Sequence, residues 1–149
     1  MPPILLAVDK IYPKGLMWFR RDLRVDDNAA LYQALRACRQ VVCVFVFDRA
    51  ILDPLRERGL VRDRRVEFIR DSAAALDTAL AALGAAHGIA GGGLIVRHDD
   101  AREAVPRLAA ELHAQAVYAN HDDEPAALAR DAQVRGALAD AGIALHTSK

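Results

Sequence analysis

Charged side chains that could bind a ligand follow directly on an apolar run near the start of the chain. Residues 15–30 read GLMWFRRDLRVDDNAA, in which the run Leu16–Phe19 suits a buried strand. The residues that come next carry charge or can cap a helix: Arg20, Arg21, Asp22, Arg24, Asp26, Asp27 and Asn28. Loops between a strand and a helix commonly bind ligands in α/β sheets. This loop offers guanidinium groups and lacks the glycines that would cradle a pyrophosphate.

A second charged group, NHDDEP from Asn120 to Pro125, follows another apolar run, and Phe47 and Asp48 end a third. If these runs are strands of a parallel sheet with the order 3-2-1-4-5, their carboxyl ends meet at one crevice. An aromatic ring, arginines and carboxylates in that crevice suit a planar, partly anionic ring system. The same side chains could instead form ion pairs that only close the edge of the sheet. The residues alone leave both interpretations open.

Alternation of short apolar runs with helical patterns predicts the fold. We expect strands at Leu16–Phe19, Val41–Phe47, Leu94–Arg97, Ala116–Ala119 and Ile143–His146. We expect helices over Ala29–Cys38, around Ile69–Leu83, around Val105–Leu112 with Pro106 near its first turn, and from Glu124-Pro125 to a C-cap at Gly142. Strict alternation favours an α/β fold: a Rossmann-like, doubly wound, five-stranded parallel sheet with helices on both faces.

Two stretches interrupt this alternation. Residues 48–64 are longer than an ordinary connection, and such loops are often functional. Gly91-Gly92-Gly93 precedes a strand, whereas phosphate loops follow one, so we interpret it as a flexible, hairpin-like tip.

Composition narrows the class of protein. The 149 residues make one domain, with 53% hydrophobic but only 5% aromatic residues. The 20 basic and 20 acidic residues balance, which argues against DNA binding through the surface of this domain. Cys38 and Cys43, on a predicted helix and a predicted strand, are expected to be buried and small. We see no secretory signal or membrane-spanning run, and expect a soluble, cytoplasmic protein.

Two motifs resemble those of the DNA photolyase/cryptochrome family. WFRRDLRVDDN is similar to the family's opening strand and loop, and NHDDEPAALARDAQV (120–134) to the segment after its fourth strand. RRVEFI (64–69) and GIALHT (142–147) also match in position. The resemblance covers residues 15–149, the photolyase N-terminal α/β domain, and leaves 1–14 as an extension that forms an extra strand or a disordered arm.

The resemblance implies a light-harvesting antenna domain with no catalytic residue of its own. In a photolyase, a helical FAD domain of the same parent chain binds damaged DNA. There, light-driven electron transfer from reduced FAD splits cyclobutane pyrimidine dimers. That domain is absent from this chain, so the chain alone is not expected to be the lyase. The alternatives are a cryptochrome photoreceptor and a stand-alone nucleotide-binding α/β protein, although the latter predicts a glycine-rich loop after a strand.

The resemblance also implies which antenna binds. The positions that match the deazaflavin site of the family are Arg21, Phe47, Asp48, Arg65, Asp122 and Glu124. The folate site of other members has an Asn-Glu pair where this chain has Ala126 and Ala127. We therefore expect 8-hydroxy-5-deazaflavin or FMN in preference to methenyltetrahydrofolate. Asp123 stands where the family commonly has an aromatic residue, which alters one wall.

A metal site is the remaining alternative. His98-Asp99-Asp100 and His121-Asp122-Asp123 contain legitimate ligands. They follow strands three and four, which are not neighbours in the order 3-2-1-4-5, so the two groups should lie apart. Asp100 more simply begins a helix. We therefore predict no metal site.

Overall fold

A single parallel sheet organises the part of the chain that the computed structural model describes, residues 10–49, 64–88 and 92–149. The strand order is β3-β2-β1-β4-β5, which confirms the predicted topology. The strands are β1 (Tyr12–Phe19), β2 (Cys38–Asp48), β3 (Leu94–Asp99), β4 (Ala116–Asn120) and β5 (Ala144–Ser148). The helices between them are α2 (Ala29–Ala37), α4 (Arg64–Ala86), α5 (Ala101–Glu111) and α6 (Pro125–Asp140).

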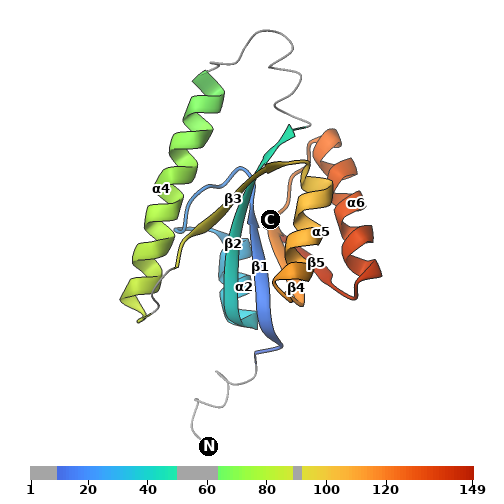
Figure 1. Ribbon diagram of the computed structural model, residues 1–149, viewed down its shortest axis with the longest axis horizontal. Coiled ribbons are helices and arrows are strands. Elements are labelled where there is room, and N and C mark those ends of the chain that lie inside the picture. The colour runs from blue at the N-terminus through green and yellow to red at the C-terminus, as the bar shows by residue number, and fades with distance from the viewer. Residues whose placement is uncertain (1–9, 50–63, 89–91) are drawn as a thin grey trace, which may run out of the picture.

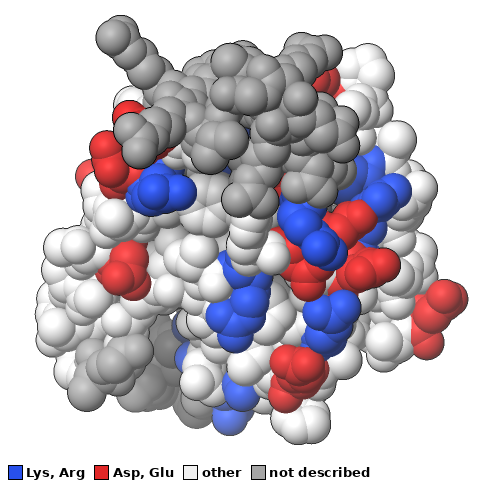
Figure 2. Space-filling view, turned by 45° about the horizontal axis from the view of Figure 1, so that its top comes forward, with Lys and Arg blue, Asp and Glu red and all other residues white. Residues whose placement is uncertain are grey.

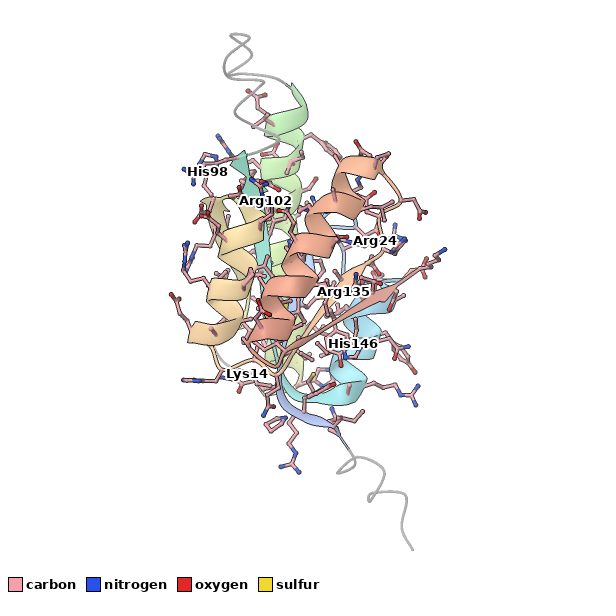
Figure 3. The ribbon with its side chains drawn as sticks, turned by 90° about the vertical axis from the view of Figure 1, so that its right-hand side faces the viewer. Lys14, Arg24, His98, Arg102, Arg135 and His146 are labelled. Atoms are coloured by element: carbon pink, nitrogen blue, oxygen red, sulfur yellow. The ribbon has the colours of Figure 1, made fainter. Side chains whose placement is uncertain are left out.

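Helices cover both faces of this sheet (Figure 1). Successive residues of β1 point to opposite faces, as the strand period requires. Leu16 and Trp18 pack with the apolar side chains of α5 and α6, whereas Met17 and Phe19 pack with those of α2 and α4. Leu16 and Phe19 are at most 1% exposed, and burying such side chains stabilises a fold by roughly 2 kcal/mol each. Figure 3 shows α5 and α6 side by side on one face, with His98 and Arg102 at the opposite end from Lys14.

Local signals set the helix ends. The Asn28 side chain accepts a hydrogen bond from the Leu31 amide at 3.0 Å and caps α2, and Asp100 caps α5 as expected. Gly142 follows α6 with a φ of 75°, the left-handed conformation that suits glycine at a helix end. Pro106 was wrongly expected near the first turn of α5. Asp100 starts that helix earlier, so Pro106 lies inside it and leaves one helical hydrogen bond unmade.

Three further expectations need correction. Cys38 begins β2 and does not belong to the helix before it, because it pairs with Tyr12. The same pairing extends β1 three residues upstream of Gly15, into the predicted extension. Gly92 and Gly93 connect α4 to β3, which is parallel to its neighbour β2, so they form no hairpin tip. Asp77 accepts a hydrogen bond from the Leu94 amide at 2.7 Å, and a Cβ on Gly93 would lie 2.6 Å from that carboxylate.

Residues 1–9, most of the loop 48–64 and Gly91 lie outside the described residues. Within the described residues, no helix is both long and apolar enough to cross a lipid bilayer.

Candidate functional site

A cavity of about 620 Å³ opens at the carboxyl ends of β1 and β2, beside the start of α6. This is the edge of a doubly wound sheet at which ligands bind. Its described lining comprises Trp18, Phe19, Arg20, Arg21, Phe45, Val46, Phe47, Asp48, Ile69, Ala101, Arg102, Asp122, Glu124, Ala126, Ala127, Ala129, Arg130 and Gln133. Figure 2 views the molecule from this edge and shows basic and acidic side chains next to one another. We call this cavity the crevice.

The crevice brings together five of the six predicted site residues: Arg21, Phe47, Asp48, Asp122 and Glu124. Arg65 lies in the first turn of α4, but its side chain is outside the described residues. The prediction for Arg65 therefore stays a prediction.

Arg21 forms one rim of the crevice with two acidic residues of the loop after β4. Its Nε lies 3.1 Å from a carboxylate oxygen of Asp122, and its Nη2 donates to Glu124. The Arg21 side chain is 66% exposed, so these ion pairs add little to stability. Their effect is to hold a guanidinium and two carboxylates at the mouth of the crevice, where a ligand can exchange for them.

A buried ion cluster lies deeper, and it was not predicted from the sequence as part of the site. Asp131 on α6 accepts hydrogen bonds from Arg20 at 2.5 Å and from Arg130 at 3.2 Å. Arg130 also approaches Asp48 at 4.0 Å. The side chains of Arg20 and Asp131 are 8% and 6% exposed. Burial lowers the pKa of the Arg20 guanidinium, and its hydrogen bond to Asp131 opposes that effect.

A helical spacing could have revealed this cluster. Asp131 precedes Val134 and Leu138 by three and seven positions, so it lies on the buried face of α6. A buried carboxylate requires a cationic partner, and the guanidinium groups of the first loop were the available candidates.

Some polar atoms of this cluster are buried without a hydrogen-bond partner among the described residues. They are Arg20 Nε, Arg130 Nη2 and Asp131 Oδ2. Such atoms are rare in native proteins and call for an explanation. Arg130 lines the crevice, but its unpaired Nη2 is itself buried, so this N–H is not exposed to a ligand in the cavity.

Trp18 is both a core residue, as expected, and part of the crevice lining. It is 2% exposed. The guanidinium carbons of Arg20 and Arg130 stand 4.8 and 5.2 Å from its ring centroid. Both distances are within the range of cation–π attraction. The indole therefore helps to hold the two arginines in place.

Two asparagines join the loops that carry these groups. Asn120, at the end of β4, donates to Asn28 Oδ1 at 2.9 Å and accepts from the Ala30 amide at 3.0 Å. Arg20 donates to the Asn120 carbonyl oxygen. A second, polar cavity of about 340 Å³ adjoins this loop and is lined by Arg20, Arg21, Asp22, Asn120, His121, Asp122, Asp123 and Glu124.

The two His-Asp-Asp groups lie apart, because β2 and β1 separate β3 from β4. Asp99 is held by Arg49 at 2.9 Å and Arg107 at 3.2 Å, and a hydrogen bond from the Asp100 amide is the largest cause that lowers its pKa. The pKa of Asp100 is lowered chiefly by its hydrogen bond from Arg102. Among the described residues, no three His, Cys, Asp or Glu side chains are grouped as metal ligands would be.

Comparison with known proteins identifies the fold. Residues 15–149 match the sequence profile of the DNA photolyase family. A deoxyribodipyrimidine photo-lyase from a Synechococcus strain is 35% identical over 86% of this chain. A Cryptochrome DASH from Natronomonas pharaonis is 36% identical over 89%. An uncharacterized 31.6 kDa protein of another Synechococcus strain is 40% identical over 91% of the chain.

A solved structure agrees with these relatives. The archaeal photolyase of Sulfolobus tokodaii, described with two FAD molecules and a novel light-harvesting cofactor, superposes with a TM-score of 0.72 at 28% identity. That alignment covers 91% of this chain and 29% of the archaeal one. The chain spans 44% of the length of the 31.6 kDa relative and 24% of that of the Synechococcus photo-lyase. The chain therefore belongs to the DNA photolyase/cryptochrome family, and it has the fold of the N-terminal α/β domain of that family.

Proposed function

We propose that the crevice binds a flavin-type light-harvesting chromophore, with 8-hydroxy-5-deazaflavin or FMN favoured over methenyltetrahydrofolate. The observation that supports this most directly is a cavity of about 620 Å³ whose lining combines apolar side chains with arginines and carboxylates. That volume is within the roughly 300–1,000 Å³ of typical small-molecule sites. When bound, the chromophore supplies absorption of light and transfer of excitation energy.

The residues present fit such a ring. Phe47 gives an aromatic wall, and the alanines of α6 give an apolar wall of small side chains that leaves room for a ring. The rim arginine Arg21, whose side chain is 66% exposed, could donate to a ring carbonyl or to an anionic oxygen. Asp122 and Glu124 can accept from a ring N–H or from ribityl hydroxyls. Ala126 and Ala127 both line the crevice and offer no polar side-chain group, which disfavours the folate arrangement described for other family members.

The parent protein is proposed to be a deoxyribodipyrimidine photolyase of the cytoplasm. In it, the excited chromophore transfers energy to reduced FAD in a helical domain, which binds damaged DNA and splits cyclobutane pyrimidine dimers. The balance of 20 basic and 20 acidic residues supports leaving DNA contact to that other domain. A cryptochrome photoreceptor is the second candidate, because one relative at 36% identity is a Cryptochrome DASH. Dimer repair by the full-length protein under light would separate the two.

A fluorescence titration of the purified chain tests the chromophore. Deazaflavin, FMN, FAD and methenyltetrahydrofolate are titrated separately, and emission of the ligand and of Trp18, the single tryptophan, is followed. Saturable binding of a flavin-type ring supports the proposal. Binding of folate alone would show that Ala126 and Ala127 were misinterpreted.

Filling the crevice should abolish most binding. We expect Ala126→Trp, which places an indole in the crevice, to weaken FMN binding at least tenfold without unfolding the chain, because Ala126 is exposed. Ala132→Trp is the matched control, since Ala132 is also exposed on α6 but does not line the crevice. Equal affinities of the two variants would place the ligand elsewhere.

Removal of the rim arginine should have a smaller effect on affinity and none on folding. We expect Arg21→Ala to weaken FMN binding about tenfold, the loss of one charge-assisted hydrogen bond. The midpoint of thermal unfolding should stay within about 2 °C, because the exposed ion pairs of Arg21 contribute little. Arg24→Ala is the control in the same loop, since Arg24 is 57% exposed and does not line the crevice. Unchanged FMN affinity in Arg21→Ala would contradict the role of Arg21.

A further inference from the structure

Trp18 poses a chemical problem for the proposed ligand. An excited flavin-type ring is a strong one-electron oxidant, and indole is among the most easily oxidised side chains. Among the described lining residues Trp18 is the only one of this kind, because the lining contains no tyrosine, methionine or cysteine. A nearby indole would give one electron to the excited ring, becoming a radical cation. The electron would then return, and the excitation energy would be lost as heat before it could be transferred.

The surroundings of Trp18 oppose this reaction. Two guanidinium groups stand over its ring, at 4.8 Å for Arg20 and 5.2 Å for Arg130. Each positive charge attracts the electrons of the neutral ring and repels the positive charge that would form when an electron leaves. Burial of the cluster strengthens this effect, since solvent screening is weak around side chains that are 8% and 15% exposed.

The neighbouring carboxylates do not cancel the effect of the two cations on the indole. Asp131 bonds to both guanidiniums, and Asp48 lies 4.0 Å from Arg130, so the two arginines and two aspartates are neutral as a group. The groups that stand over the indole are nevertheless the two cations.

We propose that Arg20 and Arg130 make Trp18 resistant to one-electron oxidation, so that an excited chromophore in the crevice keeps its energy for transfer. This inference rests on the proposed function for its purpose, but not for its chemistry. Arg20 and Arg130 are thereby positioning residues that act through Trp18.

The first test uses FMN bound at saturation and measures its excited-state lifetime. In the native chain the bound lifetime should be at least half that of free FMN. Arg130→Gln removes one cation and should shorten the lifetime at least twofold. Trp18→Phe added to Arg130→Gln should restore it, because the electron donor is gone. A strongly quenched native complex, an unchanged lifetime in Arg130→Gln, or equal shortening with and without Trp18 would overturn the proposal.

The second test needs no bound chromophore. Azide radicals generated by pulse radiolysis oxidise tryptophan by one electron, and the indole radical is followed by its visible absorption. We expect Trp18 to be oxidised at least threefold faster in Arg130→Gln than in the native chain. Arg20→Gln gives the same comparison if Arg130→Gln does not fold, and circular dichroism checks folding in each case.

The two measurements separate this inference from the proposed function. If FMN does not bind but the indole of Arg130→Gln is oxidised faster, the chromophore proposal fails and the protection of Trp18 stands. If FMN binds and the oxidation rates are equal, the crevice proposal stands and the protection of Trp18 is wrong.

Discussion

Asp131→Ala is expected to destabilise the chain by about 3–5 kcal/mol, the largest effect of any substitution considered for the crevice. The carboxylate accepts hydrogen bonds from two arginines whose side chains are 8% and 15% exposed. Without it, Arg20 would be buried beside Arg130 with no bonded counterion, and burial already lowers the pKa of Arg20. Urea unfolding followed by far-ultraviolet circular dichroism measures the change, since Trp18 emission would respond to the lost cluster directly.

Two further variants show whether the loss comes from buried charge. Asp131→Asn keeps an acceptor for Arg20 and should lose less stability than Asp131→Ala. Glu103→Ala removes an exposed partner, 3.9 Å from Arg107, and should change the unfolding free energy by less than about 0.5 kcal/mol. A loss below about 1 kcal/mol for Asp131→Ala would mean that water or another acidic group replaces Asp131.

The second large effect is expected at Gly15, inside β1. Gly15→Ala should destabilise the chain by about 1–3 kcal/mol, the usual cost of overpacking a core. A Cβ at this position would lie 2.4 Å from Cys38 Sγ and 3.3 Å from Cys38 Cβ. Cys38 is 1% exposed, so its sulfur cannot turn away without displacing other packed core side chains.

A double-mutant cycle identifies the cause. Cys38→Ala removes the sulfur, so adding Gly15→Ala to it should cost at least 1 kcal/mol less than in the native chain, within the range of coupling for residues in contact. Gly136→Ala is the contrasting control. Gly136 lies in α6 with nothing within 4 Å of an added Cβ, and alanine there should stabilise the helix by about 0.5–1 kcal/mol. Equal effects at Gly15 with and without the Cys38 sulfur would exclude the clash.

The spacing of the apolar residues, and the alternation of strand and helix patterns along the chain, made most of the fold predictable. The five apolar runs became the five strands because each is short and is separated from the next by a helical pattern. The central strands β1 and β4 are largely buried, whereas the edge strands β3 and β5 are partly exposed. The ends of the strands differed from the predicted ends where pairing with a neighbouring strand fixed the boundary. Cys38 follows a helical pattern, but its pairing with Tyr12 across β1 and β2 makes it a strand residue. Such a partner lies 26 positions away, and no local pattern can reveal it.

The residues of the candidate site also fall into those that could be predicted from the sequence and those that could not. Arg21, Asp122 and Glu124 were predictable because they follow strands that must end at the same edge. Arg130 and Asp131 follow no strand but lie within α6, where Arg130 lines the crevice and Asp131 binds Arg20. Trp18 was predictable as core but not as a wall of the site, since that depends on the arginines above it.

The paired asparagines have a consequence for the thermodynamics of ligand entry. Asn120 ties the end of β4 to the start of α2 through Asn28 and Ala30, and its carbonyl oxygen holds Arg20. The loops on either side of the crevice are thus fixed to each other before any ligand arrives. Because these loops are already ordered, the binding of a ligand between them should lower the conformational entropy of the protein only slightly. Ordering of the protein should therefore subtract little from the free energy of binding.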